Sequence, residues 1–376
     1  MKKLRIGLIG FGFMGKTHLW SVRNLPFYYK TDALGYTAEV VAVCASTPER
    51  AQAAAAEFDI PRAATPEEIL NDPTIDVVDI CSPNPHHFET AKAAILAGKH
   101  VLCEKPLTVT AAEACELARL SREHGRICGT VFNNRFLSPV LRARELLDEG
   151  RLGRLLSFDF SYHHNSCIDP ARRVGWKQTA DFGGGTLMDL GPHVVDLCHH
   201  LCGELSFVLG RSQIAYPTHQ RADGSLWQTD ADEAFYLLCG NREGAMGHIT
   251  VSKLTQGAND ELAFRIYGER GSLSFSLMDP NYLYFYDATA PVPPLGGTSG
   301  YVRIECVGRY PTPASGFPTV KAPQGWLRGH MGAMENYLSA VAGGVPCSPS
   351  FEDGAYVQRV LEAARESDRL GREVRL

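Results

Sequence analysis

The first 130 residues alternate short apolar runs with segments of helical spacing. Apolar runs bounded by turn residues are typical of buried parallel strands, and the alanine-rich segments between them repeat with a helical period. This alternation predicts an α/β class domain with a doubly wound parallel sheet, the Rossmann fold. The predicted strands cover residues 4–9, 40–44, 77–81, 100–103 and 130–132, and the predicted helices cover residues 49–58, 66–70, 87–97 and 111–124.

Beyond residue 130 the pattern changes to runs of period-two or β-rich character. Strands joined by short turns favour a mainly antiparallel open sheet, so the second domain is expected to be α+β. We therefore predict two domains, residues 1–130 and 131–376. The second domain is expected to hold helices at 139–148, 331–341 and 351–369, strands at 155–163, 207–216, 233–238, 247–254, 262–267 and 272–277, and an irregular stretch at 287–325.

Composition narrows the class of protein. A chain of 376 residues with 44% hydrophobic and 21% charged residues has a globular composition and room for two cores. The net charge of -5 is spread without basic blocks, so nucleic acid is not an expected partner. No apolar run approaches the roughly 18 residues of a membrane span. Eleven scattered cysteines lack the spacing of a disulfide scaffold, which favours a cytoplasmic location.

A glycine-rich turn follows the first predicted strand and opens a helix. In the pattern G-x-G-x-x-G the first glycine permits a tight turn, the second admits a pyrophosphate and the third lets helix pack on strand. The pattern alone would be weak evidence, but its place after a strand predicts a dinucleotide site. The turn consists of Gly10, Phe11, Gly12, Phe13, Met14 and Gly15.

The end of the second strand bears on which dinucleotide binds. An acidic residue there accepts hydrogen bonds from the ribose hydroxyls of NAD, whereas this chain has Ala45, Ser46 and Thr47. Ser46 and Thr47 could donate to a 2'-phosphate and Arg50 could pair with it, which tilts the prediction slightly toward NADP over NAD. Serine can also bind a plain ribose, and Arg50 could be a solvated helix residue.

Several motifs together resemble the Gfo/Idh/MocA oxidoreductase family, which includes glucose-fructose oxidoreductase and inositol dehydrogenases. The resemblance spans nearly the whole chain, and its most specific element is the EKP within GKHVLCEKPL. The motifs are GFGFMGKTH, CSPNPHHFETAKAAILAGKHVLCEKPLTVT, FNNRFLSP, GGGTLMDLGPHVVDL and FEDGAYVQRVLEAARES.

The resemblance implies a Rossmann domain, a sheet domain whose open face serves in oligomerisation, and an active site in the cleft between them. A homodimer or homotetramer is then expected. The implied catalytic set is Lys105, Asp189 and His193, and the implied cofactor contacts are Ser82, Pro83, Asn84, His87, Glu104, Lys105 and Asn133. This chain departs from the family in lacking the acid after the second strand, in an insertion at residues 27–37, and in Lys177, where a tryptophan-arginine pair is common.

The implied catalytic set suits alcohol oxidation. A nicotinamide supplies only the hydride acceptor, so the protein must take the hydroxyl proton. We expect His193 to act as general base or acid, Lys105 to stabilise the developing alkoxide, and Asp189 to bind the hydroxyl or fix the imidazole. Lys105 could instead be the principal acid. Asp189 and His193 are one helical turn apart, but Pro192 requires the helix either to begin near Leu190 or to kink.

Further polar residues suggest contacts with a polyhydroxylated ligand. The substrate contacts predicted are His163, Asn165, Trp176 and Lys177. The spacing of Cys198, His199, His200 and Cys202 could suggest zinc, but four ligands cannot converge from one short helix, so no metal is expected.

We therefore expect an enzyme, an NAD(P)-dependent dehydrogenase or reductase that acts on the secondary hydroxyl or ketone of a sugar, cyclitol or glycoside. Two alternatives stay open. One is an NAD-dependent glycosidase or lyase that oxidises its sugar transiently, and the other is a non-catalytic dinucleotide sensor.

Overall fold

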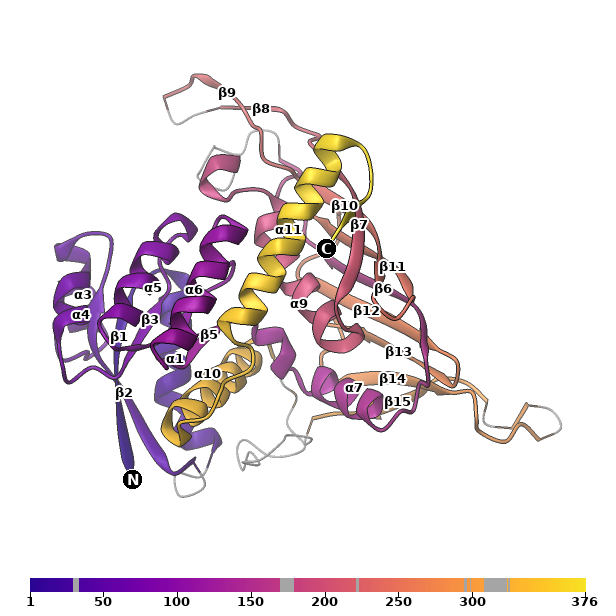
Figure 1. Cartoon of the computed structure of the whole chain (residues 1–376), viewed down its shortest axis with the longest axis horizontal. Helices are drawn as coiled ribbons and strands as arrows, with labels where there is room; N and C mark the ends of the chain where they lie inside the picture. The colour runs from indigo at the N-terminus through magenta and orange to yellow at the C-terminus, as the bar shows by residue number, and fades with distance from the viewer. Residues whose placement is uncertain are drawn as a thin grey trace. The chain divides into compact units, whose positions relative to one another are not determined.

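The computed structural model describes residues 1–29, 34–169, 179–220, 223–293, 296–297, 299–307, 323 and 325–376 (Figure 1). The chain forms two compact units. The first comprises Met1–Leu137 and Tyr310–Gln358, and the second comprises Ser138–Arg309 and Arg359–Leu376. We expected residues 131–376 to form one domain, whereas the chain returns to the first unit near its C-terminal end.

The first unit contains the predicted Rossmann sheet. Five strands lie in the order β2-β1-β3-β4-β5, and all of their pairings are parallel. Strand order reverses between β1 and β3, which is where ligands bind in such sheets. The strands are β1 (Lys2–Ile9), β2 (Tyr36–Cys44), β3 (Val77–Ile80), β4 (His100–Cys103) and β5 (Cys128–Thr130).

Helices cover both faces of this sheet. Local sequence fixes where two of them begin, because Thr65 and Thr110 each form a capping box with the glutamate three residues on. The helices are α1 (Phe13–Tyr28), α3 (Pro48–Glu57), α4 (Pro66–Asn71), α5 (His87–Leu96), α6 (Ala111–Glu123) and α10 (Trp326–Gly343), with 3-10 turns η1 (Asn84–His86) and η2 (Asn133–Phe136).

The return of the chain to the first unit is explained by α10. This helix contacts α1 (Figure 1), and both contribute to one buried cluster. Met331, Met334 and Leu338 of α10 share that cluster with Leu19 and Val22 of α1. Burial of these apolar side chains stabilises the association of the two helices, which lie some three hundred residues apart in sequence.

The second unit is built on the predicted sheet. Nine strands lie in the order β15-β14-β13-β12-β6-β11-β10-β7-β16, antiparallel except for the parallel pair β6 and β11. One strand, β15, lies within the stretch expected to be irregular. The strands are β6 (Leu155–His163), β7 (Leu205–Gln213), β10 (Ala234–Asn241), β11 (Met246–Ser252), β12 (Glu261–Gly268), β13 (Gly271–Ser276), β14 (Tyr282–Asp287), β15 (Val302–Glu305) and β16 (Val374–Arg375); β8 (Thr218–Gln220) and β9 (Leu226–Gln228) form a separate hairpin.

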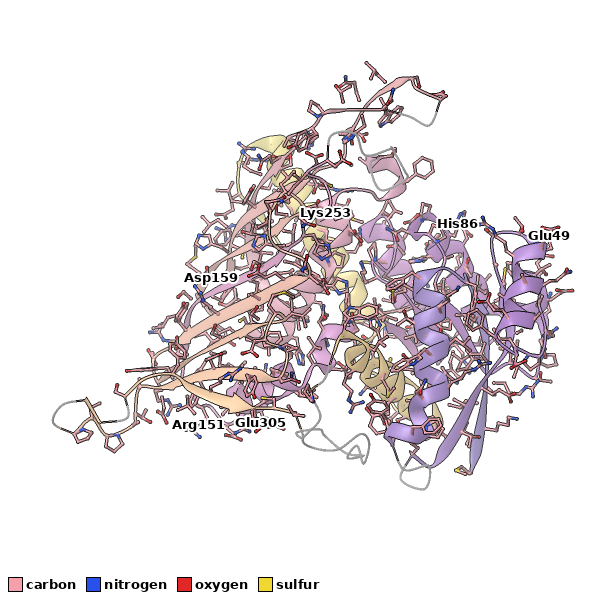
Figure 2. All side chains as sticks on the ribbon, turned by 180° about the vertical axis from the view of Figure 1, so that it is seen from behind. Glu49, His86, Arg151, Asp159, Lys253 and Glu305 are labelled. Carbon is pink, nitrogen blue, oxygen red and sulfur yellow. The ribbon has the colours of Figure 1, made fainter. Side chains whose placement is uncertain are left out.

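Helices contact this sheet, and its strands alternate between buried and accessible side chains. Helices α7 (Ser138–Asp148), α8 (Thr186–Asp189) and α9 (Gly191–Cys202) pack on it. In β6, Phe158 and Phe160 are buried while Asp159, labelled in Figure 2, is exposed and pairs with His248 of β11. The alternation indicates that one face is covered and the other is accessible.

Two remaining elements complete the described chain. A 3-10 turn, η4 (Ala180–Phe182), precedes α8, and α11 (Phe351–Leu370) is the last helix. Among the described helices, none combines the length and hydropathy needed to cross a bilayer.

Candidate active site

The glycine turn after β1 has the geometry that the pattern predicts. Gly10 has φ +98°, and a Cβ there would lie 2.5 Å from the backbone between Cys81 and Ser82. A Cβ at Gly15 would lie 2.2 Å from the Gly10 carbonyl oxygen. A Cβ at Gly12 would meet no described atom within 4 Å, so protein packing does not explain glycine there. Gly12 is also the N-cap of α1 and supplies no side-chain cap, which leaves the first-turn amides for an anion.

The other residues of the turn lie at the same end of α1. Phe13 is exposed and stacks on Trp326 of α10 at a centroid distance of 5.5 Å. Phe11 packs edge-on against Phe58 at 5.3 Å, and Met14 is half-buried. Aromatic side chains therefore flank the glycine backbone.

The residues that are expected to select between NAD and NADP follow β2 and are exposed to solvent. Arg50 donates to the Ser46 hydroxyl at 3.0 Å, and its backbone amide donates to the Thr47 side chain, which caps α3. The nearest acidic residue in the chain is Glu49, labelled in Figure 2, in the first turn of α3. Ser46, Thr47 and Arg50 are thus grouped, with the guanidinium of Arg50 held beside the Ser46 hydroxyl.

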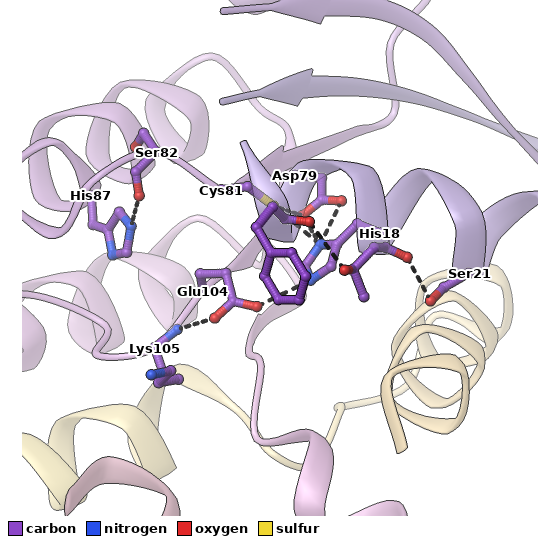
Figure 3. A network of polar contacts seen from close by, with 10 residues as sticks. His18, Ser21, Asp79, Cys81, Ser82, His87, Glu104 and Lys105 are labelled. Atoms are coloured by element: carbon purple, nitrogen blue, oxygen red, sulfur yellow. Dashed lines mark hydrogen bonds and ion pairs between the residues drawn. The ribbon is translucent and has the colours of Figure 1, made fainter. Parts of the chain in front are cut away.

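A polar network lies where β1, β3 and β4 end (Figure 3). Nδ1 of His18 lies 2.9 and 3.0 Å from the two carboxylate oxygens of Asp79, and Nε2 lies 3.1 Å from Oε1 of Glu104. The second carboxylate oxygen of Glu104 accepts the backbone amide of Lys105 at 3.0 Å. The network therefore joins α1 and β3 to the Glu104-Lys105 turn.

Burial and pairing set the charges of this network. Burial alone would lower the pKa of His18, but the carboxylate of Asp79 raises it well above the usual value. Burial opposes ionisation of Glu104, yet the hydrogen bond and charge of His18 lower its pKa to about 2. His330 of α10, whose ring lies 4.2 Å from that of Trp326 at an angle of 57°, is held neutral because burial lowers its pKa to about 3. An imidazolium is thus held between two carboxylates.

The other predicted cofactor contacts lie around this network. His87 is fully buried, with its ring nitrogens 2.9 Å from the Pro106 carbonyl and 2.8 Å from the Ser82 carbonyl, so it ties two turns together. Pro83 is exposed, while Asn84 and Asn133 are buried. These contacts to a dinucleotide stay predictions.

In the second unit, Asp189 and His193 lie on either side of a helix break. Helix α8 ends at Asp189 and α9 begins at Gly191, with Pro192 in its first turn, as the proline predicted. Lys253, at the end of β11 and labelled in Figure 2, donates to Oδ2 of Asp189 at 2.6 Å. Asp189 is therefore already paired with a lysine of its own unit.

His193 lies among aromatic and acidic side chains. Its ring is 5.8 Å from the Tyr162 ring, edge to face. The Tyr162 hydroxyl donates to Asp260 at 2.5 Å, and Nε2 of His164 lies 3.0 Å from the same oxygen. Burial opposes ionisation of Asp260, but the hydrogen bonds from His164 and Tyr162 lower its pKa. A carboxylate thus anchors the surroundings of the imidazole.

The predicted substrate contacts divide into two groups. His163 is half-buried with Nδ1 3.2 Å from the Thr255 hydroxyl, and Asn165 is exposed after β6. Trp176 and Lys177 lie outside the described residues. Cys198 and Cys202 are buried in α9, in agreement with core thiols.

Among the described residues of the first unit, two groups of side chains have metal-ligand spacing. They are His18, Asp79 and Cys81, and His18, Glu104 and His330, with ligand atoms within 4.8 Å of one another. His18 belongs to both groups, but both of its ring nitrogens already face carboxylates. A metal ion could bind a ring nitrogen only by displacing the proton that this nitrogen shares with its carboxylate. Absence of a metal stays a prediction.

Sequence reasoning missed His18, Lys253 and His330. A signal was present for the first: His18, Val22 and Leu25 share one buried face of α1, and Asp79 interrupts an apolar strand. A lone polar residue at a core position indicates a buried partner. Lys253 ends an apolar strand in the same way.

Comparison with known proteins covers both units. Residues 4–132 match the model of an oxidoreductase family with an NAD-binding Rossmann fold, and residues 140–274 match that of the GFO/IDH/MocA C-terminal domain. The chain is 31% identical to levoglucosan dehydrogenase from Pseudarthrobacter phenanthrenivorans, over 98% of this chain and 96% of that protein. It is 37% identical to scyllo-inositol 2-dehydrogenase (NADP(+)) from Bacillus subtilis, over 36% of this chain and 37% of that protein.

A solved structure of levoglucosan dehydrogenase, in complex with NADH and levoglucosan, is similar throughout. Its TM-score is 0.92 at 28% identity, and the match covers 100% of this chain and 99% of that chain. Similarity therefore extends over both units.

Proposed function

The chain belongs to the Gfo/Idh/MocA family of oxidoreductases, and from this membership we propose that it transfers a hydride between a nicotinamide dinucleotide and a secondary hydroxyl or ketone of a sugar, cyclitol or glycoside. The observation that carries the proposal is the glycine turn at the switch point of the sheet, with Gly12 open and α1 uncapped. The lysine, aspartate and histidine of the family pattern are present as Lys105, Asp189 and His193.

The turn fits a dinucleotide. The amides at the start of α1 would hold the pyrophosphate, and Ser46, Thr47 and Arg50 would lie toward the adenosine ribose. Their hydroxyls and guanidinium favour a 2'-phosphate, so we propose a slight preference for NADP over NAD. When bound, the nicotinamide supplies the hydride acceptor or donor.

The chain's own residues move the proton. We propose that His193 accepts the hydroxyl proton during oxidation and returns it during reduction, and that Lys105 stabilises the developing alkoxide charge. Asp189, held by Lys253, fixes a hydroxyl of the substrate. Tyr162 and His164 limit the positions open to the His193 ring through their shared bonds to Asp260.

The substrate class is supported by the relatives. One is a levoglucosan dehydrogenase and another a scyllo-inositol dehydrogenase, both named for polyhydroxylated rings. His163 and Asn165 bear the donors and acceptors that such a ring requires. We propose that they contact it, together with Trp176 and Lys177.

We further propose a cytoplasmic homodimer or homotetramer. All eleven cysteines are free, which suits a reducing compartment. The accessible face of the nine-stranded sheet carries exposed apolar side chains, among them Tyr236, Leu238 and Met246. A second copy of the sheet would cover them.

A screen of substrates tests the proposed function. Sugars, inositols and 1,6-anhydro sugars are each incubated with NAD and NADP while the absorbance of the reduced nicotinamide is followed. We expect cofactor reduction with at least one polyol, and its loss in Lys105→Ala. Product release from a glycoside without net reduction would favour the transient-oxidation alternative, and binding without turnover would favour the sensor.

A further inference from the structure

We propose that His18 is a positioning residue that sets the conformation of the Glu104-Lys105 turn. The role of Lys105 in chemistry rests on the proposed function, whereas the contacts that hold the turn do not. Both ring nitrogens of His18 are engaged by carboxylates, that of Asp79 in β3 at 2.9 Å and that of Glu104, which follows β4, at 3.1 Å (Figure 3).

The two oxygens of Glu104 have separate partners. Oε1 faces Nε2 of His18, and Oε2 accepts the backbone amide of Lys105 at 3.0 Å. The carboxylate can hold that amide only in the rotamer that His18 selects, because turning the group for one partner moves it from the other. The position of Lys105 therefore depends on a side chain of α1.

Charge makes the dependence strong. Asp79, His18 and Glu104 are all at most 5% exposed, so neither carboxylate can exchange its cation for water. The groups that face His18 are Asp79 of β3, Cys81 after β3, Glu104 after β4 and His330 of α10. His330 has no described hydrogen-bond partner at either nitrogen and burial keeps it neutral, so it does not replace His18 as the cation.

Helix α1 also places His18 by its own packing. Leu19, Val22 and Leu25 of the same helix are buried in the core, and the helix begins at the glycine turn. The residue that holds the Lys105 turn thus lies on the helix whose N-terminus is proposed to hold the pyrophosphate. One rigid element then aligns both parts of the site.

Two isosteric variants separate the two contacts. In His18→Gln the side-chain amide can reach the position of Nε2 and donate to Glu104, and in His18→Asn it can reach that of Nδ1 and donate to Asp79. His18→Leu keeps the volume and removes both donors. Amide hydrogen exchange at Lys105 is measured in each, with the amide of Leu8 in β1 as the reference for global opening.

We expect exchange at Lys105 to accelerate by about tenfold or more in the Asn and Leu variants while Leu8 stays protected, and to stay within about threefold of wild type in the Gln variant. With any polyol that the wild type oxidises, kcat should fall by about 10- to 100-fold in the Asn and Leu variants, with the Kd of NADH and NADPH within about threefold.

Three outcomes overturn the proposal. The first is that His18→Gln and His18→Leu accelerate amide exchange at Lys105 equally. The second is that exchange at Lys105 accelerates only as much as exchange at Leu8 does. The third is that no variant changes the exchange rate at Lys105. If a variant is too unstable, Glu104→Gln removes the same contact from the other side and must accelerate exchange at Lys105. If the wild type oxidises no polyol, the proposed function fails while the exchange data still decide the role of His18.

Discussion

The Nζ atom of Lys253 lies 2.6 Å from Oδ2 of Asp189, across 64 residues of sequence. The lysine side chain is 8% exposed and the aspartate side chain 23% exposed. Asp189 is therefore the partner of a buried cation, which holds its carboxylate at the end of α8. The pair joins the end of that helix to the end of β11.

Removing the cation should destabilise the second unit. In Lys253→Met the carboxylate of Asp189 loses its partner in a partly buried place, and we expect the free energy of unfolding to fall by about 2–4 kcal/mol. Denaturant unfolding measures this, with Lys3→Met as control because the Lys3-Glu39 pair is exposed and should contribute less than about 1 kcal/mol. Equal losses in the two variants would mean that the buried pair has no special role.

Loss of the proposed acid-base groups should abolish turnover without abolishing binding. Lys105→Ala and His193→Ala should each lower kcat/KM by about 10²- to 10⁴-fold, because proton transfer and alkoxide stabilisation are lost. Steady-state kinetics measures the loss. Lys92→Ala, at a half-buried position paired with Glu116, and His124→Ala, at an exposed position, serve as matched controls. Full activity in either Lys105→Ala or His193→Ala would remove that residue from the catalytic set.

The contribution of His18 to stability should depend on pH in two directions. The pKa of Glu104 is about 2 in the folded protein, compared with 4.5 for an unperturbed glutamate. The stability that the His18-Glu104 pair contributes is therefore lost as the pH falls below about 5. Since the folded pKa of His18 is raised above 6.5, its contribution is complete below that pH and is lost as the pH rises through the folded value.

The difference in unfolding free energy between wild type and His18→Leu should therefore be largest between about pH 5 and 6.5. His330, whose pKa burial lowers to about 3, stays neutral there and does not contribute to the difference. Denaturant unfolding at successive pH values gives the profile. A difference that does not change with pH would show that the imidazole is uncharged in the fold.

Dinucleotide preference should respond to the group after β2. Arg50→Ala should raise the KM for NADP by about tenfold and leave that for NAD within about twofold, because a guanidinium-phosphate contact is lost. Ser46→Asp should repel the 2'-phosphate and shift preference to NAD. Arg119→Ala, in an exposed pair on α6, is the control. If Arg50→Ala raises both KM values equally, the predicted contact with the 2'-phosphate is wrong.

Local patterns predicted the fold well where chain neighbours decide structure. The Rossmann strands, the glycine turn and the break before Pro192 were confirmed, because strand burial, backbone freedom and the missing proline amide act within a few residues. The return of α10 to the first unit was not foreseen. Its apolar face packs against α1, which lies near the other end of the chain, and local sequence does not indicate such a contact.

The site could be predicted only in part for the same reason. Motif resemblance predicts Lys105, Asp189 and His193 as the catalytic set, but it does not indicate the residues that hold two of them. Glu104 contacts His18, which lies 86 residues away in the sequence, and Asp189 contacts Lys253, which lies 64 residues away. A sequence marks such residues only as polar side chains in apolar surroundings, and does not say which pairs meet.

Calorimetric titration of the folded protein with NADH and NADPH tests whether the glycine turn binds a dinucleotide. We predict one site per chain for at least one of them. In Gly12→Ala we expect the affinity to fall by about tenfold or more, because a methyl group would occupy the pyrophosphate position, while the unfolding of that variant is unchanged. Failure of both dinucleotides to bind the folded wild type would contradict this prediction.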